Sequence, residues 1–456
     1  MMKIKYILGV SLLASSLSGC GLYTKFQNTP DAEIVDNLYD YNQASSDTES
    51  IAALAWGELF TDPQLQRLIE TALEQNSDLN VARLNVEQAE IALRTARLAY
   101  LPSLGFDASA STNSVPSSSY TLSVSASWQI DIFGKLKSAK EQQKVLLEQS
   151  QAYEQVVQTE LIATVANSYY SLLLLDKQLE ISNRSLEAWQ ANIRTVEALN
   201  RAGRVNKTSV LQAKANKVAL ESSIVAQEQQ VSQLENTLST LLCTIPQTIE
   251  RGSIDDSTFD SELSIGVPLE LLGNRPDVRV AELQLAQAYY ATNVARASLY
   301  PSLTLGGSAS YSDGSGVISN PSEVIYTAVA SIVQPIFYQG TLRAQVQISE
   351  AQQQQALLQF NQAILDAGAE VNTALIDWQS AKKQMDYDQE QIDLLSEALR
   401  SSELLMKHGS INYLEVLTAQ LSLLQAELSY SASQYDQIQG VIDLYRALGG
   451  GADSGL

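Results

Sequence analysis

The residue types that most often perform chemistry are scarce in this chain. Its 456 residues include one histidine, His408, and two cysteines, Cys20 and Cys243. One histidine and two cysteines cannot supply a Ser-His-Asp set or a zinc cluster. His408 stands beside Gly409, where a contact with a helix end or plain exposure is expected. The sequence therefore predicts a protein that is not an enzyme and that binds no metal or cofactor.

One further stretch has a composition that could bind an anion. Residues 203–208, Gly-Arg-Val-Asn-Lys-Thr, superficially resemble a phosphate-binding loop. The stretch lacks the spacing and the second glycine of such a loop. It is expected to be a turn between two helices.

The chemistry that the sequence does predict is lipid attachment at Cys20. Lys3 and Lys5 precede a short apolar run over residues 7–17, and Leu-Ser-Gly-Cys follows. This pattern is typical of a secretory signal over residues 1–19 that is removed before an acylated cysteine. The alternative is an ordinary signal with an incidental cysteine. Gly21, in place of an aspartate, favours delivery to the outer membrane, and residues 20–55 read as the tether from the lipid anchor.

The remaining cysteine and the overall charge set two further expectations. If Cys20 is acylated, Cys243 has no disulfide partner, and its apolar neighbours favour a buried position. The net charge of −22 disfavours nucleic acid as a partner. An acidic surface suits the passage of cations, but it equally suits long, solvent-exposed helices.

Alternation of apolar and polar residues predicts strands at about 103–112, 120–132 and 302–312, and a fourth, which alternates less clearly, at about 324–335. The second is the clearest, because apolar residues from Tyr120 to Ile132 alternate with small polar ones. One apolar and one polar face fit a membrane barrel; a strand of a soluble sandwich is the alternative. The candidates for anchoring at the membrane interface, or for simple core packing, are Trp128, Tyr100, Tyr120, Tyr300, Tyr311 and Tyr326.

Two very long helices follow the strand pairs. Residues 135–201 contain no proline or glycine, and residues 341–407 contain one glycine, so each predicts a helix about 100 Å long. Gly203 and Gly409 end these helices. Shorter helices with heptad-like spacing then return, the first over residues 206–243.

The sequence contains an internal repeat. The stretch around Pro102, Ala-Arg-Leu-Ala-Tyr-Leu-Pro-Ser-Leu, reappears around Pro301 as Ala-Arg-Ala-Ser-Leu-Tyr-Pro-Ser-Leu. Each proline ends a helix and begins a strand. Residues 56–243 and 275–448 are therefore predicted to be two copies of one unit, separated by an irregular linker (244–274) and followed by a tail (449–456).

Four membrane strands cannot close into a barrel by themselves. Two chains would give eight strands and a filled interior, whereas three would give twelve strands and leave room for a pore. A trimer is therefore favoured for transport. The long helices must leave the membrane on one side as a coiled-coil tube.

The chain resembles the TolC-like outer-membrane efflux channels, in the lipoprotein branch that serves tripartite RND-type pumps. The resemblance covers essentially the whole mature chain. It is carried by the long motifs WGELFTDPQLQRLIETALEQNSDLNVARLNVEQAE (56–90), WQIDIFGKLKSA (128–139), LLGNRPDVRVAELQLAQAYYATNVARASLYPSL (271–303), QPIFYQGTLRAQV (334–346) and LYRALGGG (444–451).

The resemblance implies a mostly α fold with a membrane β-barrel: a homotrimer with a 12-stranded barrel and a 12-helix periplasmic tunnel. It implies a passive, gated conduit that exports drugs or other small toxic compounds across the outer membrane. The implied partners are a periplasmic adaptor protein, an inner-membrane RND-type transporter and outer-membrane lipid. Four methionines and one histidine do not support a lumen built for soft metals. The alternative function is a structural or adhesive coiled-coil fibre anchored by a small barrel.

The resemblance also suggests functional positions. It places the tip turns that dock the adaptor at Gly203, Arg204, Gly409 and Ser410, and the junction of barrel and tunnel at Pro102 and Pro301. In the periplasmic gate, Leu414 matches a leucine of the family, and Thr418 stands where many members have an aspartate. Leu405 and Met406 replace an arginine and a tyrosine found in some members. Ordinary heptad packing is the alternative role for these two residues.

Overall fold

The fold was obtained as a computed structural model. It describes residues 23–27, 55–112, 118–256, 275–313, 324–407 and 413–450. Cys20, His408, Gly409 and Ser410 lie outside the described residues. So do the signal sequence, most of the tether, part of the linker and nearly all of the C-terminal tail.

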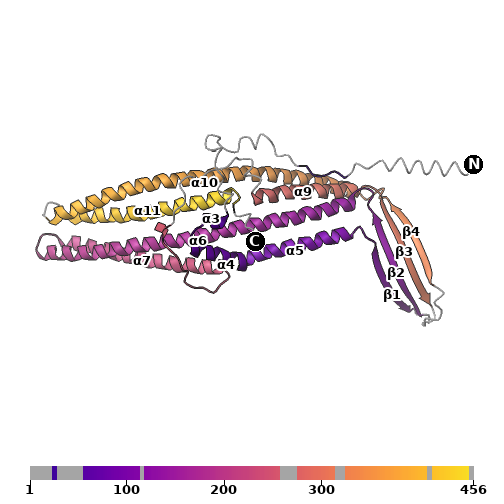
Figure 1. Cartoon of the computed structure of the whole chain (residues 1–456), viewed down its shortest axis with the longest axis horizontal. Coiled ribbons are helices and arrows are strands. Elements are labelled where there is room, and N and C mark those ends of the chain that lie inside the picture. The colour runs from indigo at the N-terminus through magenta and orange to yellow at the C-terminus, as the bar shows by residue number, and fades with distance from the viewer. Residues whose placement is uncertain are drawn as a thin grey trace, which may run out of the picture. The chain divides into compact units, whose positions relative to one another are not determined.

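The predicted order of elements is confirmed in both copies (Figure 1). Corresponding helices have equal lengths of 22, 67 and 35 residues. The first copy contains α5 (Ser77–Leu98), β1 (Ser103–Thr112), β2 (Ser118–Ile130), α6 (Lys135–Arg201) and α7 (Lys207–Leu241). The second contains α9 (Pro276–Ala297), β3 (Ser302–Asp313), β4 (Ile325–Val333), α10 (Thr341–Lys407) and α11 (Tyr413–Ala447). Two short helices, α3 (Trp56–Leu59) and α4 (Pro63–Gln75), precede them, and a 3-10 helix (Ile254–Asp256) follows α7.

The four strands form one antiparallel sheet in the order β1-β2-β3-β4. The register carries the alternation across the whole sheet. Phe106 pairs with Val124, and Val124 pairs with Ala309, which in turn pairs with Tyr326. Apolar residues of all four strands therefore share one face, as the period of two requires.

The described residues form two compact units, and each unit takes residues from both copies. Unit 1 contains the sheet and the helical residues nearest to it in sequence, within 83–153 and 279–363, together with 23–27. Unit 2 contains α3, α4, α7, α11, the remaining parts of α6 and α10, and the described linker residues. The two compact units therefore do not coincide with the two copies of the sequence repeat.

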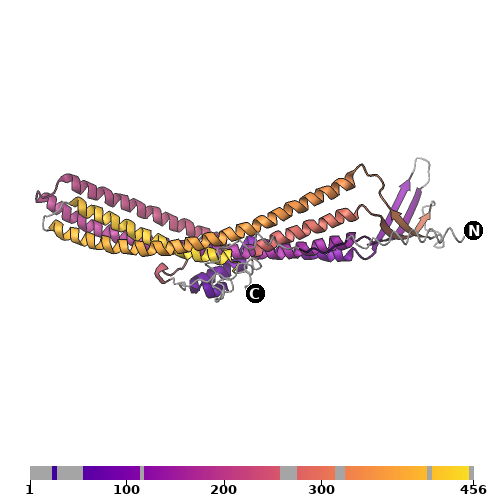
Figure 2. The ribbon, with the colours of Figure 1, turned by 90° about the horizontal axis from the view of Figure 1, so that it is seen from above.

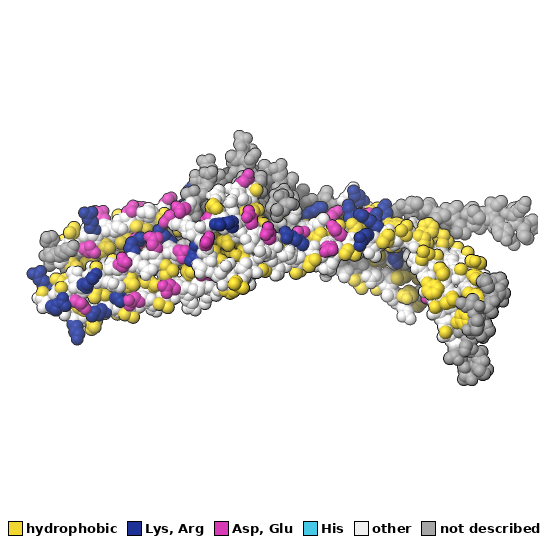
Figure 3. Space-filling model, turned by 60° about the horizontal axis from the view of Figure 1, so that its bottom comes forward, with side chains coloured by type: hydrophobic (Ala, Val, Ile, Leu, Met, Phe, Trp, Pro, Cys, Tyr) yellow, Lys and Arg dark blue, Asp and Glu magenta, His cyan; other side chains and the backbone are white. Residues whose placement is uncertain are grey.

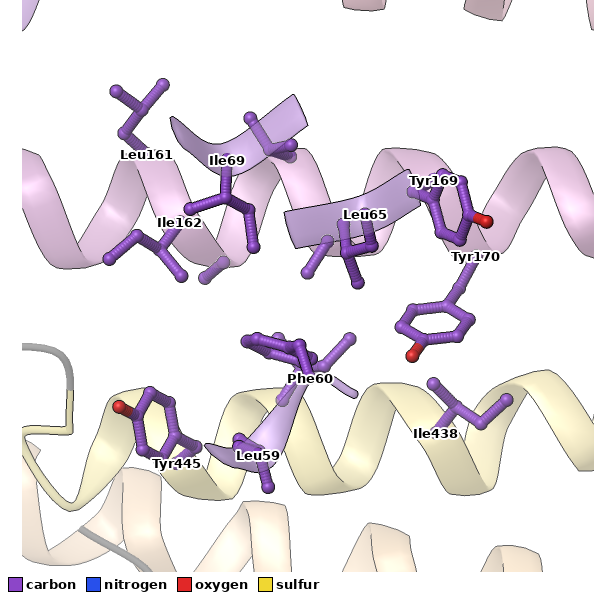
Figure 4. Close-up of a cluster of buried hydrophobic side chains, with 14 of the residues drawn as sticks. Leu59, Phe60, Leu65, Ile69, Leu161, Ile162, Tyr169, Tyr170, Ile438 and Tyr445 are labelled. Atoms are coloured by element: carbon purple, nitrogen blue, oxygen red, sulfur yellow. The ribbon is translucent and has the colours of Figure 1, made fainter. Parts of the chain in front are cut away.

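The main core of unit 2 lies where the short N-terminal helices meet α6 and α11. Figure 4 shows Leu59, Phe60, Leu65 and Ile69 facing α6 and α11 side chains. All four are buried, because the amphipathic stripe of α4 and the chain before it cover an apolar face of the long helix. This cluster ties α4 to both copies of the repeat.

Gly440 allows α10 and α11 to approach closely in the same unit. A Cβ atom at position 440 would lie 2.9 Å from the Cα atom of Trp378. A backbone atom cannot move aside as the end of a side chain can, so this crossing requires glycine. The return helices α7 and α11 lie beside α6 and α10 in both views of the ribbon (Figures 1 and 2).

The structure also corrects several expected positions. Cys243 is exposed, so its predicted burial was wrong; Leu242 occupies the core instead, and Cys243 has a φ of 52°. Strand β2 covers 118–130 and not 120–132, because the carboxylate of Asp131 accepts hydrogen bonds from the backbone amides of Leu136 and Lys137 and so caps α6. Strand β4 covers 325–333, shorter than the predicted 324–335.

Candidate functional site

The sheet presents an apolar face that this single chain leaves exposed. Figure 3 shows hydrophobic side chains gathered over the strands. The exposed apolar residues of that face are Leu104, Phe106, Val124, Trp128, Tyr326 and Ile332. On β1, β2 and β3 the opposite face carries mostly small polar residues, such as Ser123, Ser125 and Ser308. On β4 it also carries the exposed residues Ile325, Val329 and Val333. Strands β1 and β4 are the outer strands, so the sheet has two open edges.

Matching contacts fasten the strands to the helix ends at both junctions. The indole Nε1 of Trp128 donates to the carbonyl of Tyr100 at 2.9 Å, and the amide Nε2 of Gln334 donates to the carbonyl of Leu299 at 3.1 Å. Tyr100 and Leu299 occupy equivalent positions two residues before Pro102 and Pro301. Each junction is thus tied to the end of the strand pair that follows it.

The turn between α6 and α7 is closed by local hydrogen bonds. Gly203 has a φ of +74°, and the amide of Arg204 donates to the carbonyl of Leu199 at 2.9 Å. The side chain of Asn206 then caps α7 by accepting from the amide of Ser209 at 3.1 Å. This arrangement is a glycine-terminated helix followed by a capped one. Arg204 is left exposed at the turn.

The second predicted tip turn falls on residues 408–412, which lie outside the described residues, but the ends of α10 and α11 on either side are described. Met406 is buried, with 7% of its surface exposed, and packs with Val196, Val210, Tyr413 and Leu417. Leu405, Leu414 and Thr418 are exposed. The Thr418 hydroxyl donates to the carbonyl of Leu414 one turn earlier, at 2.9 Å. Met406 therefore belongs to the tip core, whereas the other three gate candidates face outward from it.

An ionic centre around the buried guanidinium of Arg275 lies at the start of the second copy, and the sequence did not predict it. The Arg275 guanidinium bonds to the carboxylates of Asp277 and Glu370, each at 2.6 Å, and to the carbonyl of Ala447, also at 2.6 Å. Burial opposes the charge, but the hydrogen bonds that the guanidinium donates to the two carboxylates raise the pKa of Arg275 above its usual range. In the sequence, Arg-Pro-Asp is also the pattern of a helix start, with proline at the first helical position. The isolated arginine before the proline was the available signal.

Two negative findings concern the described residues. None of their helices is both long and apolar enough to cross a membrane. The described side chains also contain no group of three or more histidine, cysteine or acidic residues placed to hold a metal ion.

Comparison with known proteins identifies the family. A family model described as outer membrane efflux protein matches residues 68–244 and 267–450. The pyoverdine export outer membrane protein OpmQ of Pseudomonas putida is 33% identical over 90% of this chain and 91% of its own length. The cation efflux system protein CusC of Escherichia coli is 29% identical over 96% of this chain and 98% of its own.

A solved structure agrees with this result. The open state of the Neisseria gonorrhoeae MtrE outer membrane channel superposes with a TM-score of 0.84 at 29% identity, covering 94% of this chain and 98% of that one. The chain belongs to the outer membrane efflux protein family. It has the fold of these channels, and it is an outer-membrane efflux channel.

Proposed function

We propose that three copies of this chain close their sheets into one 12-stranded barrel and continue as a 12-helix periplasmic tunnel. The observation that carries this is the exposed, one-sided sheet with two open edges. In a bilayer each unpaired edge group costs several kcal/mol, so the edges must be paired by further copies. The polar face, lined with serines, would then face the lumen.

The conduit is passive and gated, and its energy comes from elsewhere. We infer that it works in a tripartite system with a periplasmic adaptor and an inner-membrane RND-type transporter, and that Cys20 carries the lipid anchor. Lipid attachment is supported by one relative, named as a probable outer membrane lipoprotein, SilC of Salmonella typhimurium, which is 28% identical over 99% of both chains. No chemical step is assigned to the chain itself.

The proposed cargo is drugs or other small toxic compounds. Relatives are named for different cargoes, including pyoverdine export, cation efflux and toluene efflux. A shared channel fold therefore serves varied solutes. Deleting the protein and scoring sensitivity to detergents, dyes, antibiotics and metals tests which class of compound is exported. Unchanged sensitivity to all of them would overturn the proposed cargo.

A pair of adjacent substitutions tests the barrel. Val124 lies on the apolar face of β2, and Ser123 lies on the polar face. A lysine on the lipid face near the middle of a bilayer costs about 2–4 kcal/mol, whereas lumen positions tolerate charge and change selectivity. Val124→Lys should reduce assembled trimer in the outer membrane. Ser123→Lys should assemble normally and shift ion selectivity in planar bilayers, and equal effects of both would contradict a barrel.

The adhesive fibre is disfavoured by the return helices. Helices α7 and α11 have the same length and fold back beside α6 and α10. A fibre requires neither a return helix nor a duplicated sheet. Loss of adhesion without loss of efflux in the deletion strain would reverse this preference.

A further inference from the structure

A short N-terminal stretch, Tyr23–Gln27, lies against α9 in unit 1 (Figure 1). The ring of Phe26 packs on the ring of Tyr289 with centroids 5.6 Å apart. The side-chain amide of Asn293 donates to the carbonyl of Thr24 at 3.3 Å, and the Thr24 hydroxyl bonds to the Tyr289 hydroxyl. We call this stretch the strap. It is held by ring packing and by hydrogen bonds, so its place on α9 is specific.

The first residue of the strap reaches the turn between β2 and α6. The Lys137 ammonium lies 3.7 Å from the centroid of the Tyr23 ring. Gly134 has a φ of +75°, and a Cβ atom there would lie 3.0 Å from the Cβ atom of Tyr23. Burial beside Tyr290 raises the pKa of Tyr23 to about 12. Tyr23 is thus seated closely on Gly134.

A cavity of about 410 Å³ adjoins this seat in the same unit. Phe133 and Lys135, on either side of Gly134, line it together with Tyr300, Pro301 and Tyr338. Its size falls in the range of small-ligand sites, about 300–1,000 Å³. Ile130 and Ile132 also line it, and Ile130 belongs to the apolar face of the sheet. Gln129, Asp131 and Lys135 add polar groups to the lining. The cavity therefore has a mixed lining that includes one residue of the face assigned above to lipid.

The length of chain before the strap limits how far Cys20 can lie from Tyr23. Three residue steps separate Tyr23 from Cys20, and they span at most about 11 Å. We propose that the strap holds Cys20 beside this cavity and that an acyl chain of the lipid on Cys20 occupies it. The proposal rests on the lipidation of Cys20 proposed above. The anchor would then be a packed part of the barrel–tunnel junction and not a free tether.

Photocrosslinking in the native outer membrane tests the occupant. Tyr338, which lines the cavity, is replaced by the photocrosslinking amino acid p-benzoylphenylalanine, and adducts are identified by mass spectrometry after digestion. The expected adduct joins the peptide containing position 338 to the lipopeptide that begins at Cys20. The matched control is the same replacement at Tyr326, on the apolar face of β4, which should capture free phospholipid instead. Free phospholipid or another protein as the only adduct at position 338 would overturn the proposal.

A second variant tests the strap itself. Asn293→Ala with Tyr289→Phe removes both side-chain hydrogen bonds to Thr24 while keeping the ring against Phe26. Each lost hydrogen bond should lower occupancy of the strap by about fivefold, so the lipopeptide adduct at position 338 should fall accordingly. Channel conductance should stay the same. An unchanged adduct yield would remove the role of the strap.

The intact mass of the mature protein distinguishes failure of the proposed lipid docking from failure of the proposed lipidation of Cys20. A chain without lipid shows that Cys20 is not acylated, and then the proposal above has failed as well. A lipidated chain without the adduct shows that only the docking of the lipid is wrong.

Discussion

The phenol of Tyr169 on α6 donates a hydrogen bond of 2.5 Å to the carboxylate of Asp62, the residue that caps α4. The same phenol oxygen accepts from the backbone amide of Gly252 at 3.1 Å. Burial and the bond to Asp62 raise the pKa of Tyr169 above its usual range, so the phenol keeps its proton at neutral pH. One hydroxyl thus joins the cap of α4, the long helix and the linker after α7.

Tyr169→Phe should destabilise unit 2 by about 1–2 kcal/mol, because it removes two hydrogen bonds whose partners, the half-buried Asp62 and the exposed Gly252, can still reach water. Thermal unfolding of the detergent-solubilised protein, followed by circular dichroism, measures the change. Tyr153→Phe is the matched control on the same helix: its side chain is exposed, and its effect should stay within about 0.5 kcal/mol. Equal midpoints for the two variants would show that the Tyr169 hydroxyl contributes nothing.

Arg275 offers a second comparison within one short stretch. Its side chain is 8% exposed and donates hydrogen bonds to two carboxylates and a carbonyl. The side chain of Arg279, four residues later, is 49% exposed and forms an ion pair with Glu282. Arg275→Met should cost about 1–3 kcal/mol, because it removes the donor of three hydrogen bonds, one of them to the carbonyl of the buried residue Ala447. Arg279→Met should cost about 0–1 kcal/mol. Similar unfolding temperatures for the two variants would be the contrary result.

Long periodic elements were predictable from the sequence, and single contacts between them were not. The 67-residue bounds of α6 and α10 follow from the absence of proline and from the glycine and proline signals at their ends. The face of β2 follows from its alternation, and the register confirms it. These signals are local, and each element repeats them many times.

The features that were predicted wrongly or not predicted are those that depend on a single contact or turn. Cys243 has apolar neighbours in sequence, but the chain turns out of α7 there, so Leu242 is buried and Cys243 is not. The bond from Tyr169 to Asp62 joins residues 107 positions apart, and no local pattern marks it. The contact of the strap with α9 could not be predicted either, because a stretch of five residues is too short to show a periodic pattern. The proposed gate would depend on surfaces between copies, which one chain does not contain.

The carboxyl group of Asp443 on α11 predicts a dependence of stability on pH. Burial raises its pKa; Arg446 opposes this, and Glu370, Asp377 and Glu160 add to it. A raised pKa means that the folded protein favours the protonated form more than the unfolded chain does. This contribution to stability is complete below the usual pKa of about 3.9 and is lost as pH rises through the raised value.

Asp443→Asn is neutral at every pH and should therefore unfold at a higher temperature than the parent at pH 7.5. The difference should shrink as pH falls toward about 4, where the parent carboxyl also becomes neutral. Asp393→Asn, an exposed position on α10, is the control and should follow the parent at both pH values. A pH-independent gain for Asp443→Asn would indicate a packing effect and not a charge effect.

The proposed gate is tested by two residues that the structure places differently. Leu414 is 61% exposed in the single chain, whereas Met406 is buried among residues of α6, α7 and α11. If Leu414 closes the tip against neighbouring copies, Leu414→Ala should raise single-channel conductance in planar bilayers with little change in unfolding temperature. Met406→Ala should instead lower stability by about 2–5 kcal/mol through the cavity that it leaves. Unchanged conductance for Leu414→Ala, at normal trimer yield, would assign the closure of the tip to other residues.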